Sequence, residues 1–222
     1  MAIPPIEPYA MPTEADLPRN VAGWRIDPAR AVLLIHDMQQ YFVDFFPAGR
    51  SPVVDLVRNI HAIRTTAVAH GVPVVYTAQP GGMTREQRGL LRDFWGSGMA
   101  ARPELRRIVP PLEPGPDDIV LTKWRYSAFA RTNLAEVIRQ RGRDQLVVCG
   151  IYAHVGCLMS ACDAFTRDIE TFLVADAVAD FTEADHRMAV DYAAARCAVT
   201  LCTRSVVTDL AVHGALSTSP AG

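Results

Sequence analysis

The side chains best suited to acid–base chemistry are an aspartate and a lysine, each at the end of a short apolar run. Asp37 ends the run Ala31–Asp37 (AVLLIHD), and Lys123 follows the run Ile119–Thr122 (IVLT). An aspartate beside a lysine can transfer a proton, but such a pair can equally be a structural ion pair at the rim of a sheet. These two residues by themselves favour neither interpretation.

Further donors and aromatic side chains lie in the segments that follow such runs. Guanidinium, ammonium and amide groups bind carboxylates, and aromatic side chains pack against a planar ring. The set comprises Gln79, Arg88, Trp95, Lys123, Arg125 and Tyr152. Together with Asp37, this set favours a catalytic site for a small ring that carries carboxylates.

Apolar runs alternate along the chain with segments of helical periodicity. The expected buried strands are Ala31–Asp37, Val72–Ala78, Ile119–Thr122, Gln145–Cys149, Thr171–Ala175 and Ala198–Cys202. The expected helices are Val53–His70, Asn133–Arg141, Gly156–Thr166 and Glu183–Ala195, the last with Thr182 as its N-cap. This alternation predicts an α/β fold, a Rossmann-like three-layer α/β/α sandwich around a central, mostly parallel sheet of about six strands.

The length is compatible with a single domain over residues 1–222, with an extended N-terminal arm at 1–28 and a disordered tail at 214–222. In open parallel sheets, ligands bind beyond the carboxyl ends of the strands. Those ends should deliver Asp37, Gln79, Lys123, the segment Tyr152 to Gly156, and Asp176. The chain has neither a GxGxxG nor a GxxxxGK[ST] motif, so no dinucleotide or P-loop site is expected.

Composition excludes several classes of protein. Lys+Arg 22 against Asp+Glu 24 leaves no excess positive charge for a nucleic-acid interface. No apolar run approaches the roughly 20 residues of a membrane helix, and the proline- and acid-rich start is unlike a signal peptide. The five cysteines include no CxxC pair, which indicates buried thiols in a cytoplasmic protein and neither a disulfide framework nor a metal site.

Five long stretches resemble the isochorismatases of the cysteine-hydrolase-like superfamily. They are LLIHDMQQYFVD (33–44), YTAQPGGMTREQRGLLRDFWGSGM (76–99), LTKWRYSAF (121–129), GRDQLVVCGIYAHVGCL (142–158) and FLVADAVADF (172–181). The likeness extends from the N-terminal segment to about Thr203. It implies hydrolysis of the enolpyruvyl vinyl ether of isochorismate, without any cofactor.

The resemblance assigns catalytic roles to Asp37 and Lys123. Asp37 would be the general acid that protonates the terminal methylene of the vinyl ether. At pH 7 an aspartic acid with its ordinary pKa is only about 0.1% protonated. We therefore expect burial to raise the pKa of Asp37, and Lys123 to be committed to a substrate carboxylate instead of being fully paired with Asp37.

The resemblance also assigns substrate contacts. Gln79, Arg88 and Tyr152 would hold the carboxylates or ring hydroxyls, with Phe42 as a further contact. Trp95 would close over the ring and exclude water, which requires the loop 81–99 to fold down over the site.

The amidases of the superfamily carry a nucleophilic cysteine at the position of Gly156. Cys157 lies one residue later, and one helical step turns a side chain by about 100°, so Cys157 should not replace it. The absence of a nucleophile at this position agrees with chemistry that forms no acyl-enzyme. The Gly156 backbone N–H is expected to bind a substrate oxygen.

The remaining polar residues receive structural interpretations. His36 should point to the opposite face from Asp37 as a hydrogen-bonded core or supporting residue. Asp176 and Asp180 suit turns or helix caps, and the role of His154 stays open. Arg102, Arg106 and Arg107 suit a solvated helix face, although they could also steer an anion toward the site.

Three enzymatic functions remain open: hydrolysis of isochorismate, as in catecholate siderophore synthesis, of 2-amino-2-deoxyisochorismate, as in phenazine-type pathways, or cysteine-amidase chemistry. We favour the first; the complete polar set argues against a non-catalytic partner protein. The expected partners are the dicarboxylate substrate, further copies of the chain in a homodimer or higher homo-oligomer, and a separate aryl carrier protein. The segment after Thr203 is too short for a fused carrier domain of roughly 50 residues.

Overall fold

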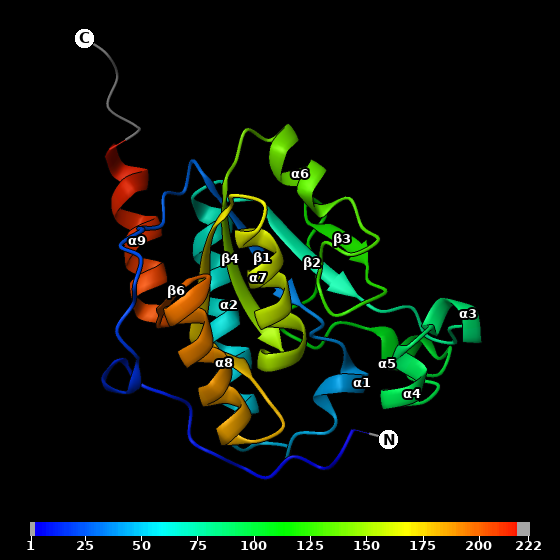
Figure 1. Ribbon diagram of the computed structural model, residues 1–222. Helices are drawn as coiled ribbons and strands as arrows, with labels where there is room; N and C mark the ends of the chain where they lie inside the picture. The colour runs from blue at the N-terminus through cyan, green and yellow to red at the C-terminus, as the bar shows by residue number, and fades with distance from the viewer. Residues whose placement is uncertain (1–2, 217–222) are drawn as a thin grey trace.

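The fold is described here from a computed structural model that covers residues 3–216 (Figure 1). Six parallel strands form one sheet in the order β3-β2-β1-β4-β5-β6. Their bounds are β1 Ala31–His36, β2 Val74–Ala78, β3 Ile119–Thr122, β4 Gln145–Ile151, β5 Glu170–Ala179 and β6 Val199–Leu201. The predicted sandwich is confirmed, and the sheet is parallel throughout.

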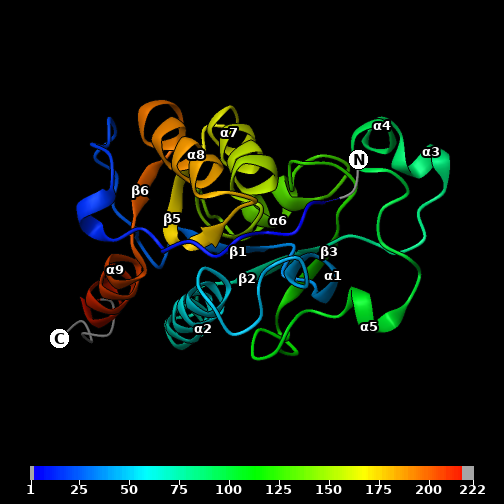
Figure 2. The same cartoon turned by 90° about the horizontal axis from the view of Figure 1, so that it is seen from below.

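Helices cover both faces of the sheet, as Figure 2 shows. Helices α2 Val53–Ala69 and α9 Thr203–Leu216 lie side by side on one face. Helices α6 Leu134–Gln140, α7 Leu158–Phe165 and α8 Glu183–Arg196 lie on the other. Every residue of β1 and β4 is buried, because two hydrophobic cores enclose the sheet from both sides.

Short elements gather at the carboxyl end of the sheet. They are α1 Gln40–Val43, α3 Arg85–Arg88, α4 Leu91–Trp95, α5 Pro103–Arg106 and the π-helical turn η2 Ala153–Cys157. The segment that carries α3 and α4 is held at its base, where the Gly82 N–H donates to Met99 O at 2.8 Å. Gly81 is required there because a Cβ on it would lie 2.2 Å from Ala100 O.

Register and local geometry set the position of the site at the end of β1. His36 lies opposite Thr77 of β2 and Gly150 of β4. Asp37 follows with φ +49°, in the left-handed region, so the extended conformation stops at His36. The alternation of side chains between the two faces therefore ends between these two residues.

The largest differences from the sequence predictions are in two elements. Strand β5 continues to Ala179, four residues beyond the predicted end, after a register irregularity with β4. Helix α9 was not predicted, and it contains residues 214–216, which were expected to belong to a disordered tail; residues 217–222 lie outside the described part.

The N-terminal arm runs along the surface with the short turn η1 Glu14–Asp16 as its regular element. It is attached where the Ile6 N–H donates to Phe45 O at 3.0 Å and where the Asp180 N–H donates to the Tyr9 hydroxyl at 2.7 Å. Within residues 3–216, no helix has the length and apolar character needed to cross a membrane.

Candidate active site

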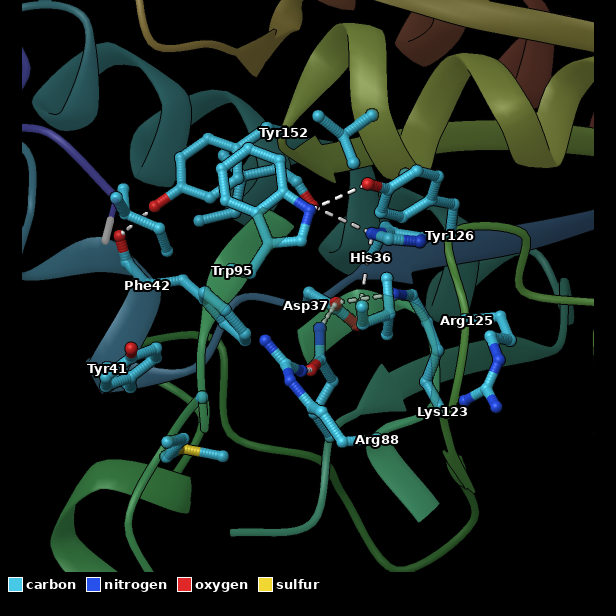
Figure 3. Close-up of a pocket in the computed structure, with 18 of the residues that line it drawn as sticks. His36, Asp37, Tyr41, Phe42, Arg88, Trp95, Lys123, Arg125, Tyr126 and Tyr152 are labelled. Atoms are coloured by element: carbon cyan, nitrogen blue, oxygen red, sulfur yellow. Dashed lines mark hydrogen bonds and ion pairs between the residues drawn. The ribbon is translucent and has the colours of Figure 1, made fainter. Parts of the chain in front are cut away.

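One pocket at the carboxyl end of the sheet contains every residue predicted to convert or bind substrate (Figure 3). These residues are Asp37, Lys123, Gln79, Arg88, Trp95, Tyr152, Gly156 and Phe42. Arg125 also lines the pocket. Asp176 does not, because β5 continues past it, and its carboxylate instead accepts hydrogen bonds from the N–H and hydroxyl of Thr203.

Asp37 is the centre of a buried polar cluster. It is 4% exposed and Lys123 is 3% exposed, with Lys123 Nζ 2.9 Å from Asp37 Oδ2. The Gln79 amide donates to Asp37 Oδ2 at 3.1 Å, and the Thr77 hydroxyl donates to Asp37 Oδ1 at 2.7 Å. Gln39 holds Gln79 in place, since Gln39 Oε1 accepts from the Gln79 N–H at 2.7 Å and its amide donates to Gln79 O.

The ionisation of Asp37 differs from the prediction. Burial raises the pKa of Asp37. The charge of Lys123, the neighbouring His36 and the hydrogen bonds from Lys123 and Thr77 lower it by more than burial raises it, so the net pKa is below its ordinary value. Asp37 is thus paired with Lys123 and has a lowered pKa, which differs from the expectation that burial raises it. Lys123 is close enough to pair fully when no substrate carboxylate competes for it.

Arg88 is a buried cation that has no ion pair with any residue in the described part of the chain. It is 6% exposed, donates to Gly96 O at 3.1 Å and to Gln79 Oε1 at 3.3 Å, and burial lowers its pKa. A capping box between Thr84 and Gln87 begins the helix that carries it. A buried guanidinium held by neutral acceptors favours binding of a carboxylate, which it can grip through two parallel hydrogen bonds.

The hydroxyl of Tyr152 is already used within the protein. It donates to Phe42 O at 2.8 Å, and the two rings meet edge to face. Burial raises the pKa of Tyr152, so the phenol stays protonated. Tyr152 therefore offers its ring to the pocket, which differs from the predicted hydrogen bond to a carboxylate.

Trp95 lines the pocket from the side of α4. Its indole N–H donates to the Tyr126 hydroxyl at 2.7 Å, and its ring lies 5.7 Å from that of Phe181. Phe181 also packs on Tyr152, with ring centroids 4.3 Å apart. Sequence reasoning missed Phe181 because β5 was expected to end at Ala175; a longer strand would have placed this residue at the strand end.

Ile3 and Tyr126 are among the other lining residues that sequence reasoning missed. Ile3 reaches the pocket from the N-terminal arm. No local pattern connects that arm with a site more than thirty residues away along the chain. Tyr126 lies within the quoted stretch 121–129, but only its contact with Trp95 reveals its place.

His36 is fully buried and hydrogen-bonded, as predicted, with Nδ1 2.8 Å from Ile151 O. The predicted orientation of His36 away from Asp37 is wrong: both side chains line the pocket, because the left-handed conformation of Asp37 interrupts the alternation before its own side chain. His36 Nδ1 lies 3.9 Å from Asp37 Oδ1, and burial lowers the pKa of His36 to about 4. The imidazole is thus neutral at pH 7.

Gly156 lines the pocket but its N–H is not free to bind a substrate oxygen. That N–H donates to Tyr152 O at 3.0 Å within the π-helical turn, so the predicted role of the N–H is wrong. The sulfur of Cys157 is fully buried, and burial raises the pKa of its thiol well above the ordinary value. A thiol of this kind is unreactive.

His154 lies beside the pocket and forms a pair with Asp180. Its Nδ1 is 2.8 Å from both Asp180 oxygens, its backbone N–H donates to Asp180 Oδ2, and the pair raises the pKa of His154. Side-chain atoms of Asp185 complete a cluster within 4.8 Å. Both Asp180 oxygens already accept hydrogen bonds, including one from the Phe181 N–H, so this cluster orders the wall that carries Phe181.

Comparison with known proteins identifies relatives over most of the chain. The family described as "Isochorismatase domain" matches residues 31–205. The isochorismatase of Bacillus subtilis (strain 168) is 57% identical over 210 residues, which span 95% of this chain and 67% of that protein. The phenazine biosynthesis protein PhzD of Pseudomonas fluorescens is 57% identical over 206 residues, which span 92% of this chain and 98% of that protein.

Among solved structures, a cysteine hydrolase from Pseudomonas syringae pv. phaseolicola 1448A superposes with a TM-score of 0.78 at 24% identity, covering 88% of this chain and 98% of that one. This likeness supports the fold. The family match and the two relatives show the family as well as the fold: the chain belongs to the isochorismatase family.

Proposed function

We propose that this protein is an isochorismatase, which hydrolyses isochorismate to pyruvate and 2,3-dihydro-2,3-dihydroxybenzoate. The observation that carries the proposal is a buried acid, Asp37, in one pocket with Lys123 and with Arg88, a cation without an ion pair among residues 3–216, where position 156 offers no nucleophile. An acid beside two cations suits protonation of a dianionic substrate. The identity of 57% to the Bacillus subtilis isochorismatase supports the same activity.

Substrate binding sets the protonation state of Asp37. Arg88 binds one carboxylate of the substrate, and Lys123 turns part of its charge toward the other. Once Lys123 is shared, burial dominates and the pKa of Asp37 rises, so that Asp37 takes up a proton. The free pocket and the loaded pocket thus differ in which anion neutralises Lys123.

Asp37 then donates its proton to the terminal methylene of the vinyl ether. The electron pair of the double bond forms the new C–H bond, and the positive charge is shared with the ether oxygen as an oxocarbenium ion. Water adds to the cationic carbon and returns a proton to the Asp37 carboxylate. The resulting hemiketal breaks its C–O bond as the ring oxygen takes up a proton, which releases pyruvate and the ring diol. The walls formed by Trp95, Phe181 and Tyr152 limit the entry of further water.

A second candidate substrate is 2-amino-2-deoxyisochorismate, which presents the same two carboxylates and differs at one ring position. It is favoured by the equal identity to a phenazine biosynthesis protein. Pyruvate release from both substrates, measured in parallel, decides between them: a higher kcat/KM with isochorismate supports our proposal, and a higher kcat/KM with the amino compound refutes it.

Cysteine-amidase chemistry is the least supported function. Its nucleophile position is Gly156, and Cys157 is buried with a raised pKa. Treatment with iodoacetamide tests it: pyruvate release should persist, whereas loss of activity in step with labelling of Cys157 would revive a thiol mechanism.

The proposed product indicates where the enzyme acts and which proteins it associates with. We place the enzyme in the cytoplasm, in a siderophore-type pathway, as a homodimer or higher homo-oligomer that works with an aryl carrier protein. Light scattering of the purified protein and a binding assay with the isolated carrier test these two associations.

A further inference from the structure

The imidazole of His36 lies directly against the backbone of Gly156. A Cβ built on Gly156 would be 2.0 Å from His36 Cε1, 2.7 Å from Nε2 and 2.8 Å from Nδ1. Ordinary contacts of a Cβ start at about 3.4 Å, so no side chain fits at position 156 while the imidazole keeps its place. The space in front of Gly156 is filled by His36.

His36 has little freedom to withdraw. It is 1% exposed, and its Nδ1 is held at 2.8 Å from Ile151 O. Its backbone is fixed as well, because Gly150 on the neighbouring strand approaches so closely that a Cβ there would lie 2.2 Å from His36 O. A second close-packed glycine therefore fixes the strand from which the imidazole projects.

The filled space lies beside the proposed acid. The Cβ position at 156 is 2.8 Å from His36 Nδ1, and that atom is 3.9 Å from Asp37 Oδ1. Gly156, Asp37 and Lys123 line the same pocket, so a thiol at position 156 would share it with a carboxylate and a cation that can activate a nucleophile. Whether position 156 can hold a side chain consequently decides whether covalent catalysis is available.

We propose that His36 is a specificity-determining residue, whose imidazole occupies the volume that a nucleophilic side chain at position 156 needs and so restricts the pocket to chemistry without a covalent intermediate. The inference rests on the proposed function in one respect: the reaction without a covalent intermediate is taken to be hydrolysis of isochorismate. Its packing argument is independent of that function.

A double-mutant cycle tests the packing. Gly156→Ala should lower Tm by about 5 °C or more, because the added methyl group overlaps the imidazole. In the His36→Ala background, the same change should lower Tm far less. Gly150→Ala is the matched control: its methyl group would meet the backbone oxygen of residue 36, so His36→Ala should not rescue it.

A covalent probe tests the consequence for chemistry. Gly156→Cys is compared alone and together with His36→Ala, using p-nitrophenyl acetate. The thiol gives its proton to Asp37 or solvent, and the thiolate attacks the ester carbonyl. The C–O bond breaks, p-nitrophenolate leaves, and the remaining thioester is detected by intact mass as one added acetyl group. The double variant should give a burst of one equivalent, mapped to position 156, and the single variant much less.

The outcomes are separable. Equal Tm losses from Gly156→Ala in both backgrounds, or an equal burst from the Gly156→Cys variant with and without His36, would overturn the role of His36. If Gly156→Cys alone does not fold, the alanine cycle still decides. Absence of pyruvate release from isochorismate by the wild-type protein would refute the proposed function and leave the cycle informative.

Discussion

Replacing Asp37 by asparagine tests the general acid most directly. The change removes the proton donor and keeps nearly the same shape. General acid catalysis contributes about 10²- to 10⁴-fold, so kcat for pyruvate release from isochorismate should fall by about that factor. Binding of the substrate should persist, because Arg88 and Lys123 still bind the carboxylates.

The structure also predicts a cost in stability. Asparagine cannot neutralise Lys123, which is 3% exposed, and the new amide nitrogen would face either the Thr77 hydroxyl or the donors on Lys123 and Gln79. Breaking a buried ion pair costs about 3–5 kcal/mol, which corresponds to a loss in Tm of about 10 °C for a chain of this size.

The double variant Asp37→Asn/Lys123→Met separates these two effects. It removes the unpaired cation and should regain most of the lost Tm, yet it should stay inactive because the donor is still missing. Tm is measured by calorimetry and kcat by pyruvate release under saturating isochorismate. An Asp37→Asn variant that folds and keeps kcat within tenfold of the wild type would refute the acid role.

Three further predictions concern the walls of the pocket. Arg88→Met should raise KM by about 10- to 100-fold, since it removes a charge-assisted contact, and it should leave Tm unchanged or higher because the cation is unpaired among the described residues; unchanged KM would contradict the role of Arg88. Trp95→Phe and Tyr126→Phe each remove the 2.7 Å hydrogen bond between these residues and should lower kcat/KM by about fivefold, and the double variant should be no worse than either single one; additive losses would show that the bond does not couple them. Because Asp180 raises the pKa of His154, this pair should stabilise the fold fully below about pH 6.5 and progressively less as pH rises through the folded pKa; denaturant titrations at several pH values should show that loss in the wild type and a flatter profile in His154→Gln, and identical profiles would count against the pair.

The sheet was predictable because its signal is local. Ile119–Thr122 has the bounds expected from its apolar run, and Thr182 caps α8 through the Asp185 N–H as expected. Buried parallel strands need continuous apolar sequence, and helix starts need a side-chain acceptor, so both features are written within a few residues. The rule that ligands bind at the carboxyl ends of strands then brought Asp37, Gln79 and Lys123 together.

The tertiary structure decided what depends on distant partners. The pKa of Asp37 is lowered because Lys123, far along the chain, lies 2.9 Å away. Phe181 lies at the site because β5 continues beyond the apolar run predicted from the sequence. His36 contacts Gly156 because alternation along β1 places it on the same side of the sheet as Val32 and Leu34, which pack with Ala153 and Cys157. Sequence thus determined the strands and the kind of residues at their ends. Packing alone determined which of those groups touch, since contact distances and burial are properties of the assembled fold.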